Sequence, residues 1–218
     1  MDVNTIVCPF SGALHFLFIR MVLMVKKNFF LWVLIMATVF PQAWANDFDV
    51  YSEGIVTDKL SGLMWMRCSV GQVWDGGTCT GEAAKLSWHE AMKTGKDFHF
   101  AGMSDWRVPR IEELNSLVYC SSGKRAAFKK NNSGEFYDGP CMGDFQMPTI
   151  NQEIFPNTPV ACWYWSSSSA AYVAYRAWGL HFAAGVVGNS FKDAIWGSWT
   201  ERRTTGRDCY VRLVRDVQ

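Results

Sequence analysis

The chain has 218 residues, enough for one domain or at most two, and 49% of them are hydrophobic. Its formal net charge of +1 provides no global electrostatic field that would attract nucleic acid or an anionic membrane surface. We therefore expect no nucleic-acid partner, and a polyanion would have to bind at a local cluster of basic residues.

The first 45 residues have the organisation of a secretory signal. Lys26 and Lys27 precede an apolar run over residues 29–40, and Ala43-Trp44-Ala45 forms a small-x-small cleavage pattern. The run has about 12 residues, whereas a membrane-spanning helix needs roughly 20. We expect cleavage after the pattern and export of residues 46–218 as a single domain with no stable membrane span. An uncleaved membrane anchor is the alternative.

Six cysteines follow the predicted cleavage site, and an even number in an exported chain indicates a disulfide framework. Six cysteines allow 15 pairings, of which proximity along the chain favours one. Its bridges are Cys68–Cys79 across a Gly-rich hairpin, Cys120–Cys141 across a polar insertion, and Cys162–Cys209 between two late strands. Metal ligation is the alternative, but no C-x-x-C motif occurs and the histidines are scattered. We expect no metal and no cofactor.

The first predicted elements are two strands and a helix. Residues 48–56 alternate loosely and predict an opening strand, and residues 63–66 predict a second one after a Ser-Gly turn. Ser87 and Glu90 have the spacing of a capping box, in which each side chain bonds the other residue's backbone amide. This box predicts a helix from Trp88 to about Asp97.

Apolar residues at positions 111, 114, 117 and 118 have helical spacing and predict a second helix that ends near Cys120. Residues 121–140 are polar and rich in Gly and Asn, which predicts an exposed loop. Four strand-like segments follow, over residues 162–167, 171–182, 185–196 and 209–215. The order predicts an α+β fold with two helices packed on a mostly antiparallel sheet.

Nine tryptophans lie after residue 45, and a tryptophan suits both a protein core and a sugar-binding surface because it joins a large apolar face to one donor. Five occur in patterned segments, where we favour a place in the core: Trp65, Trp88, Trp106, Trp165 and Trp178. Three occur in Gly-rich, turn-like segments, where ligand binding and the core are equally favoured: Trp74, Trp196 and Trp199.

Basic residues form two clusters that could hold sulfate or phosphate groups through charge-assisted hydrogen bonds. The first cluster is Lys124, Arg125, Lys129 and Lys130, and the second is Arg202, Arg203 and Arg207. A solvated loop is the alternative for each. The chain contains no G-x-S-x-G nucleophile motif and no Gly-rich phosphate-binding loop after a strand, so nothing in it points to an enzyme.

Seven segments, taken in order, resemble one protein family. They begin with VTDKLSGLMW (56–65), LSWHEA (86–91) and SDWRVP (104–109) with Glu113-Leu114, and they continue with Ile150-Asn151 and FPNT (155–158), YWSSS (164–168), Ala177-Trp178 and VRLVR (211–215). Together they resemble the C-terminal domain of the Legionella collagen-like adhesin, the Lcl C-terminal domain, over roughly residues 50–215. The residues Trp65, Trp88, Trp106, Arg107, Pro109, Trp165 and Trp178 fit this pattern as scaffold, with Arg107 expected to hydrogen-bond loop carbonyls.

The resemblance implies a C-type-lectin-like fold in its broad form, shared with formylglycine-generating enzymes. It also implies a non-enzymatic, adhesin-like binding module for sulfated or other polysaccharides in the periplasm, on the cell surface or secreted. The chain lacks the adhesin's collagen-like repeats and the sequence triplets of calcium-dependent sugar-binding lectins. Two alternatives are interaction with an envelope or host surface protein, as in a surface appendage, and an oxidase-type enzyme of the related fold that uses a cysteine.

Overall fold

The computed structural model describes residues 47–130, 136–137, 139–171, 174–192 and 209–217. The residues from Asp47 to Gln218 form a compact unit of their own. The predicted signal over residues 1–45 lies outside the described residues. No helix in the described part of the chain is long and apolar enough to cross a membrane.

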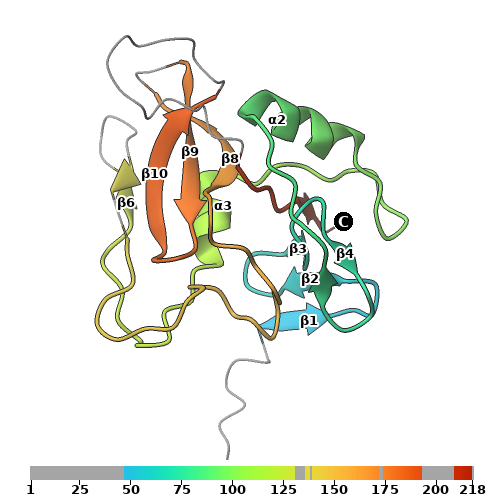
Figure 1. Cartoon of the computed structure of the whole chain (residues 1–218), viewed down its shortest axis with the longest axis horizontal. Coiled ribbons are helices and arrows are strands. Elements are labelled where there is room, and N and C mark those ends of the chain that lie inside the picture. Colours follow the sequence, from blue (N-terminus) through green and yellow to red (C-terminus); the bar gives the residue numbers. More distant parts are fainter. Residues whose placement is uncertain (1–46, 131–135, 138, 172–173, 193–208, 218) are drawn as a thin grey trace, which may run out of the picture. The chain divides into compact units, whose positions relative to one another are not determined.

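Four strands form the first sheet, in the order β1-β2-β3-β11 with antiparallel neighbours (Figure 1). Their bounds are Phe48–Val50, Ile55–Asp58, Leu63–Met66 and Val214–Asp216. The prediction of one opening strand over residues 48–56 is wrong, because the chain turns at residues 51–54 and β2 pairs back on β1. The turn uses Gly54 at a φ of 80°, in the left-handed region that favours glycine.

The second sheet has the order β10-β9-β8, again antiparallel throughout. The strands are β8 (Tyr164–Ser169), β9 (Arg176–His181) and β10 (Val186–Phe191). Each of the four predicted late segments contains a strand, the last one holding the start of β11. The strands β9 and β10 are shorter than their predicted segments, whereas β8 extends two residues beyond the predicted end. A parallel bridge between Tyr164 and Tyr210 connects this sheet to the chain that leads into β11.

The helix α2 (Trp88–Asp97) has the predicted bounds and the predicted capping box. The backbone amide of Ser87 donates to a carboxylate oxygen of Glu90 at 2.8 Å, and the amide of Glu90 donates to the Ser87 hydroxyl at 3.3 Å. The helix packs beside β8. Local sequence therefore determines both where this helix begins and how it is capped.

The helix α3 (Ile111–Ser116) packs against β8 and β9. It ends before the predicted Cys120, since Val118 forms a bridge with Ile150 and the amide of Tyr119 donates to the carbonyl of Thr149 at 3.0 Å. A long-range pairing with residues near 150 thus replaces the last predicted helical turn.

Two short hairpins complete the elements: β4 (Val73–Trp74) with β5 (Cys79–Thr80), and β6 (Lys129–Lys130) with β7 (Phe136–Tyr137). The second hairpin lies inside the segment 121–140 that we predicted as a loop without strands. Disulfides Cys68–Cys79 and Cys120–Cys141 close the two regions, each with 5.4 Å between its Cα atoms, and both pairings agree with the prediction.

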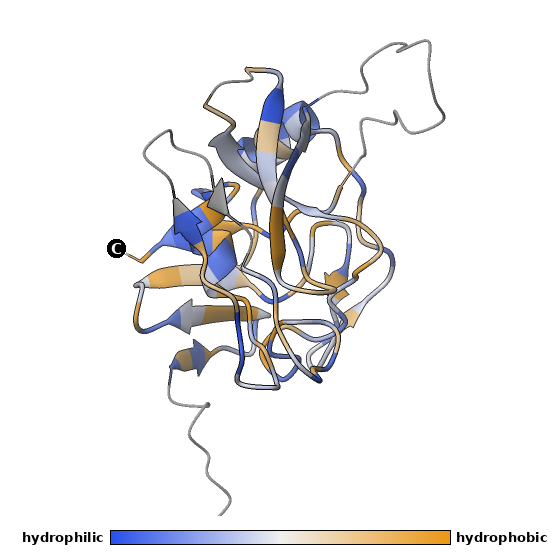
Figure 2. Ribbon diagram, turned by 90° about the vertical axis from the view of Figure 1, so that its left-hand side faces the viewer, coloured by the Kyte–Doolittle hydropathy of each residue, from blue (hydrophilic) through white to orange (hydrophobic). Residues whose placement is uncertain are grey.

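The core combines residues from both sheets and both helices. Figure 2 shows both hydrophobic and hydrophilic residues on the strands, and most residues of β2, β3 and β9 are buried. The buried tryptophans are Trp65, Trp106, Trp165 and Trp178, while Trp88 is half-buried and donates to the carbonyl of Ser166. The prediction of an α+β fold with two helices on antiparallel sheets is confirmed.

Candidate functional site

The first basic cluster lies in the loop that the Cys120–Cys141 disulfide closes. The side chains of Lys124 and Lys129 are exposed there. The Ser122 hydroxyl donates to the carbonyl of Met142 at 2.6 Å, which holds the two ends of the loop together. A disulfide and local hydrogen bonds therefore fix the base from which the two lysines project.

Arg125 belongs to the same cluster in sequence but is turned towards the protein. Its Nε donates to the carbonyl of Gly139 at 2.7 Å, and its guanidinium also donates to the side-chain oxygen of Asn115 on α3. Burial lowers the pKa of Arg125 from its ordinary value. The guanidinium thus anchors the loop to α3, and the exposed positive charge here comes from Lys124 and Lys129.

The remaining basic candidates cannot be placed on this surface. For Lys130 the structure describes only the backbone, in β6. The second basic cluster and two of the candidate tryptophans lie outside the described residues: Arg202, Arg203, Arg207, Trp196 and Trp199.

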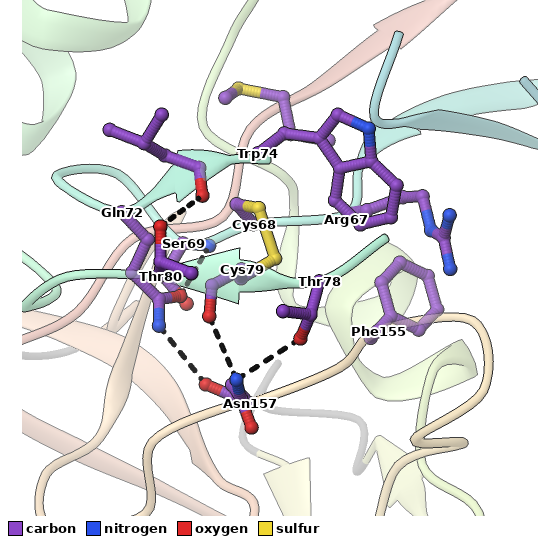
Figure 3. Close-up of a disulfide and its surroundings, with 12 residues drawn as sticks. Arg67, Cys68, Ser69, Gln72, Trp74, Thr78, Cys79, Thr80, Phe155 and Asn157 are labelled. Atoms are coloured by element: carbon purple, nitrogen blue, oxygen red, sulfur yellow. Dashed lines mark hydrogen bonds between the residues drawn. A yellow bond between two sulfur atoms is a disulfide. The ribbon is translucent and has the colours of Figure 1, made fainter. Parts of the chain in front are cut away.

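Trp74, the third candidate tryptophan, holds the β4–β5 hairpin against the rest of the domain. Its indole Nε1 donates to the carbonyl of Ser52 at 2.8 Å, and the guanidinium of Arg67 lies 4.2 Å from the ring centroid. Figure 3 shows Trp74 beside the Cys68–Cys79 disulfide, with Arg67 next to its ring. The donor and one ring face of Trp74 are thus used within the protein.

Asn157, from the FPNT segment, supports the same hairpin from the opposite side of the disulfide in Figure 3. Its side-chain amide donates to the carbonyl of Cys79 at 2.8 Å and to the Thr78 hydroxyl at 3.1 Å. Asn157 has a φ of 50°, a left-handed conformation that asparagine tolerates better than most residues. This segment therefore has a structural role in positioning the hairpin.

An open cleft with a volume of about 440 Å³ lies between α2 and the segment that follows Trp106. The residues that line it come from α2 (Met92, Gly95, Lys96), from the chain before α3 (Arg107, Val108, Arg110), from β8 (Ser167) and from β11 (Asp216). Residues of α2 and of the chain before α3 therefore meet residues of the distant strands β8 and β11 around one basic depression.

Two arginines that line this cleft, Arg107 and Arg110, both bond the carboxylate of Glu113. Arg107 forms two hydrogen bonds with Glu113, of 2.7 Å and 3.0 Å, and its Nη2 also donates to Asp216 at 3.1 Å. Arg110 Nη2 lies 2.8 Å from Glu113 Oε1. The sequence prediction that Arg107 bonds loop carbonyls through its side chain is wrong, because these carboxylates take its donors.

The pKa of Glu113 reflects two opposing effects. Burial raises it, but the hydrogen bonds from Arg107 and the Arg110 backbone amide outweigh burial and hold it below its ordinary value. The same ion pair raises the pKa of Arg107. Glu113 and Arg107 are therefore both charged at neutral pH.

Gly95 allows α2 to approach this pair of arginines closely. A Cβ at position 95 would lie 3.1 Å from the backbone nitrogen of Val108 and 3.3 Å from its Cγ2. Gly95 lies within the helix predicted over residues 88–97, but the predicted helix alone does not indicate this contact. Its contact with Val108 brings the next residue, Lys96, to the rim of the cleft, which no periodicity in the sequence indicates.

Cys162 and Cys209, the third predicted pair, are both buried, with their sulfur atoms 2.9 Å apart. That separation is longer than an S–S bond of about 2.05 Å. The structure therefore brings the two predicted partners together, and the covalent bond between them remains a prediction. Within the described ranges, no group of three or more His, Cys, Asp or Glu residues is placed to hold a metal ion.

These features define a disulfide-bonded α+β domain with exposed lysines on one closed loop and a basic cleft beside α2. Residues 54–215 match the family model described as the Lcl C-terminal domain, which covers most of the chain. The chain therefore belongs to the Lcl C-terminal domain family, as its seven segments predict. No curated protein and no solved structure matches the chain significantly.

Proposed function

We propose that this protein is an exported, non-enzymatic binding domain that recognises sulfated or other acidic polysaccharides in an adhesin-like manner. Membership of the Lcl C-terminal domain family supports this function, because the family is associated with an adhesin. The observation that carries the proposal is the closed loop that presents Lys124 and Lys129 to solvent from a fixed base.

The arrangement of charges favours an extended acidic ligand over a compact one. Lys124 and Lys129 are exposed, whereas Arg125 beside them anchors the loop to Asn115. Exposed ammonium groups attract sulfate or carboxylate groups by charge without enclosing them, so each contact is weak and sensitive to salt. A polysaccharide makes many such contacts at once, which compensates for their individual weakness.

The family resemblance further supports a C-type-lectin-like arrangement of the two sheets and an oxidising location outside the cytoplasm. Two disulfides are consistent with such a location, since disulfides persist where thiols are not kept reduced. The binding loop and the β4–β5 hairpin are each closed by one of them. In this proposal the disulfides preserve the binding surface outside the cell's reducing interior.

The test is the binding of oxidised residues 46–218 to immobilised sulfated, carboxylated and neutral polysaccharides over a series of salt concentrations. We expect binding to the acidic members that weakens steeply with salt. The variant Lys124→Gln/Lys129→Gln should bind about 5-fold more weakly at low ionic strength, since each exposed charge contributes roughly 0.5 kcal/mol.

A matched control removes the same charge elsewhere. Lys59 and Lys85 are exposed on other loops, and Lys59 forms an ion pair with Asp49 at 2.9 Å. The variant Lys59→Gln/Lys85→Gln should retain the affinity of the unmodified domain. Equal weakening in both variants would show that only net charge matters, and absence of binding to every polysaccharide would overturn the proposal.

A further inference from the structure

The basic cleft beside α2 has no part in the proposed binding of polysaccharides, and its charged residues point to a different ligand. Three cations border it, Lys96, Arg107 and Arg110, and two carboxylates, Glu113 and Asp216, are bonded to the arginines. One positive charge is therefore in excess. Within the described part of the chain, the Lys96 ammonium forms no hydrogen bond or ion pair, so its three donors face solvent at the rim.

Asp216 already shows how a carboxylate fits this cleft. It lies near the end of the chain with 74% of its side chain exposed, and one of its oxygens accepts a hydrogen bond from Arg107 Nη2 at 3.1 Å. Glu113, by contrast, is only 7% exposed and holds Arg107 from below. The buried Glu113 carboxylate therefore fixes the Arg107 guanidinium. The exposed Asp216 carboxylate bonds the solvent-facing side of the same guanidinium, where another carboxylate can displace it.

The uncharged lining residues distinguish this cleft from the lysine loop, which is the loop closed by Cys120–Cys141 that carries Lys124 and Lys129. Met92 and Val108 give the cleft an aliphatic side, Gly95 packs closely on Val108, and Ser167 contributes a hydroxyl. No aromatic side chain is among the lining residues, so a sugar ring would find no stacking surface. A ligand that joins a carboxylate to an aliphatic group uses both sides of the cleft.

We infer that the cleft between α2 and Arg107–Arg110 binds the free carboxy terminus of a peptide or protein whose last residue is aliphatic. The terminal carboxylate lies between Lys96 and the two arginines in place of the Asp216 side chain, and the last side chain lies on Met92. Capture of a terminal carboxylate by fixed donors is a recurring form of peptide recognition. The cleft volume of about 440 Å³ is that of a small-ligand site and has room for about one or two residues.

The test uses N-acetyl-leucine as the probe, titrated into ¹⁵N-labelled residues 46–218 and followed by amide chemical shifts. We expect saturable shifts in the millimolar range, centred on Lys96, Arg110 and Ser167. N-acetyl-leucinamide, which lacks the carboxylate, and acetate, which lacks the aliphatic side chain, should each bind at least 5-fold more weakly. Equal binding of the amide would overturn the inference.

Three variants separate a specific site from general attraction. Lys96→Gln and Arg110→Gln remove exposed charges at the rim, and each should weaken N-acetyl-leucine binding at least 3-fold. Asp216→Asn removes the internal competitor and should strengthen binding at least 2-fold. The control is Lys93→Gln on the same helix, because Lys93 pairs with Asp97 at 2.8 Å and does not line the cleft. Unchanged binding in both rim variants would contradict the site.

Other sources of an anionic group are distinguished in the same titration. Glucuronate carries a carboxylate on a sugar, and inorganic sulfate carries no carbon. If either binds at the cleft as tightly as N-acetyl-leucine, the assignment to a peptide carboxy terminus is wrong. The inference does not depend on the lysine loop, since Lys124→Gln/Lys129→Gln should leave this binding unchanged, so it can fail or succeed apart from the proposed function.

Discussion

Arg107 and Glu113 form a two-point ion pair, with 2.7 Å between Nη1 and Oε2, that joins the chain before α3 to the first turn of that helix. The Glu113 side chain is 7% exposed, whereas Arg107 is one-third exposed. The backbone amide of Arg110 also donates to Glu113 at 2.7 Å. One carboxylate thus fixes both arginines of the cleft and caps the helix.

Replacement of Glu113 by Gln should lower the free energy of unfolding by roughly 2–3 kcal/mol. Breaking a fully buried ion pair costs about 3–5 kcal/mol, and the partial exposure of Arg107 reduces this. Urea denaturation at pH 7 measures the change. The control is Glu82→Gln, an exposed glutamate whose replacement should stay within about 0.5 kcal/mol. Equal effects of the two substitutions would show that the buried pair does not stabilise the fold.

The same pair predicts a dependence of stability on pH. The pKa of Glu113 is lower in the folded state than its ordinary value of 4.5. Its contribution is therefore complete above about pH 4.5 and is lost as the pH falls through the lowered folded value. The stability difference between the unmodified domain and Glu113→Gln should accordingly shrink below pH 4.5. A difference that stays constant down to pH 3 would contradict this assignment.

Local sequence was sufficient for the helix α2, because Ser87 and Glu90 are three residues apart and both capping bonds form between them. The Cys68–Cys79 and Cys120–Cys141 disulfides were also predictable, since their partners are close in sequence. The cleft was not, because it depends on contacts among α2, β8 and β11 that no local pattern encodes. Gly95 is an example: its role depends on Val108 lying 3.1 Å from the position of a Cβ.

The burial of Arg212 also depends on distant contacts that its apolar neighbours in the sequence do not indicate. Its side chain is completely buried, and it lies before β11 begins. The guanidinium donates to the carbonyls of Met66 and Arg67, and the Phe155 ring centroid is 4.8 Å away. Burial lowers the pKa of this arginine and raises the pKa of the neighbouring Tyr164 to about 12.

Replacement of Arg212 by Met should destabilise the domain by about 3–5 kcal/mol. The substitution preserves volume but leaves two buried carbonyls and the Thr158 hydroxyl without their donor, at a cost of about 1–3 kcal/mol each before relaxation. Thermal and urea denaturation measure the loss. Lys85→Met on the surface is the control and should change stability by less than about 0.5 kcal/mol. A stable Arg212→Met variant would show that these hydrogen bonds are dispensable.

Gly54 and Gly81 form a natural pair for testing the role of Trp74. Their φ angles are nearly equal, 80° and 79°, but a Cβ at Gly54 would lie 2.5 Å from Trp74 Cγ, whereas a Cβ at Gly81 would have no atom within 4 Å. Gly81→Ala should cost about 1–2 kcal/mol from the backbone alone. Gly54→Ala should cost about 1–3 kcal/mol more, because the indole must move. Equal losses by urea denaturation would show that Trp74 does not pack tightly on Gly54.

The buried sulfur atoms of Cys162 and Cys209 are 2.9 Å apart, and we predict that they form the third disulfide in the exported protein. Thiol titration of the denatured, non-reduced domain should then detect no free thiol, and Cys162→Ser should release one. A bridge that spans 47 residues stabilises by about 4 kcal/mol through the unfolded chain, so Cys162→Ser/Cys209→Ser should lose roughly that amount. Two titratable thiols in protein purified from an oxidising compartment would mean that the pair stays reduced. The stability loss of the double variant would then be limited to the packing of two small side chains, about 1 kcal/mol.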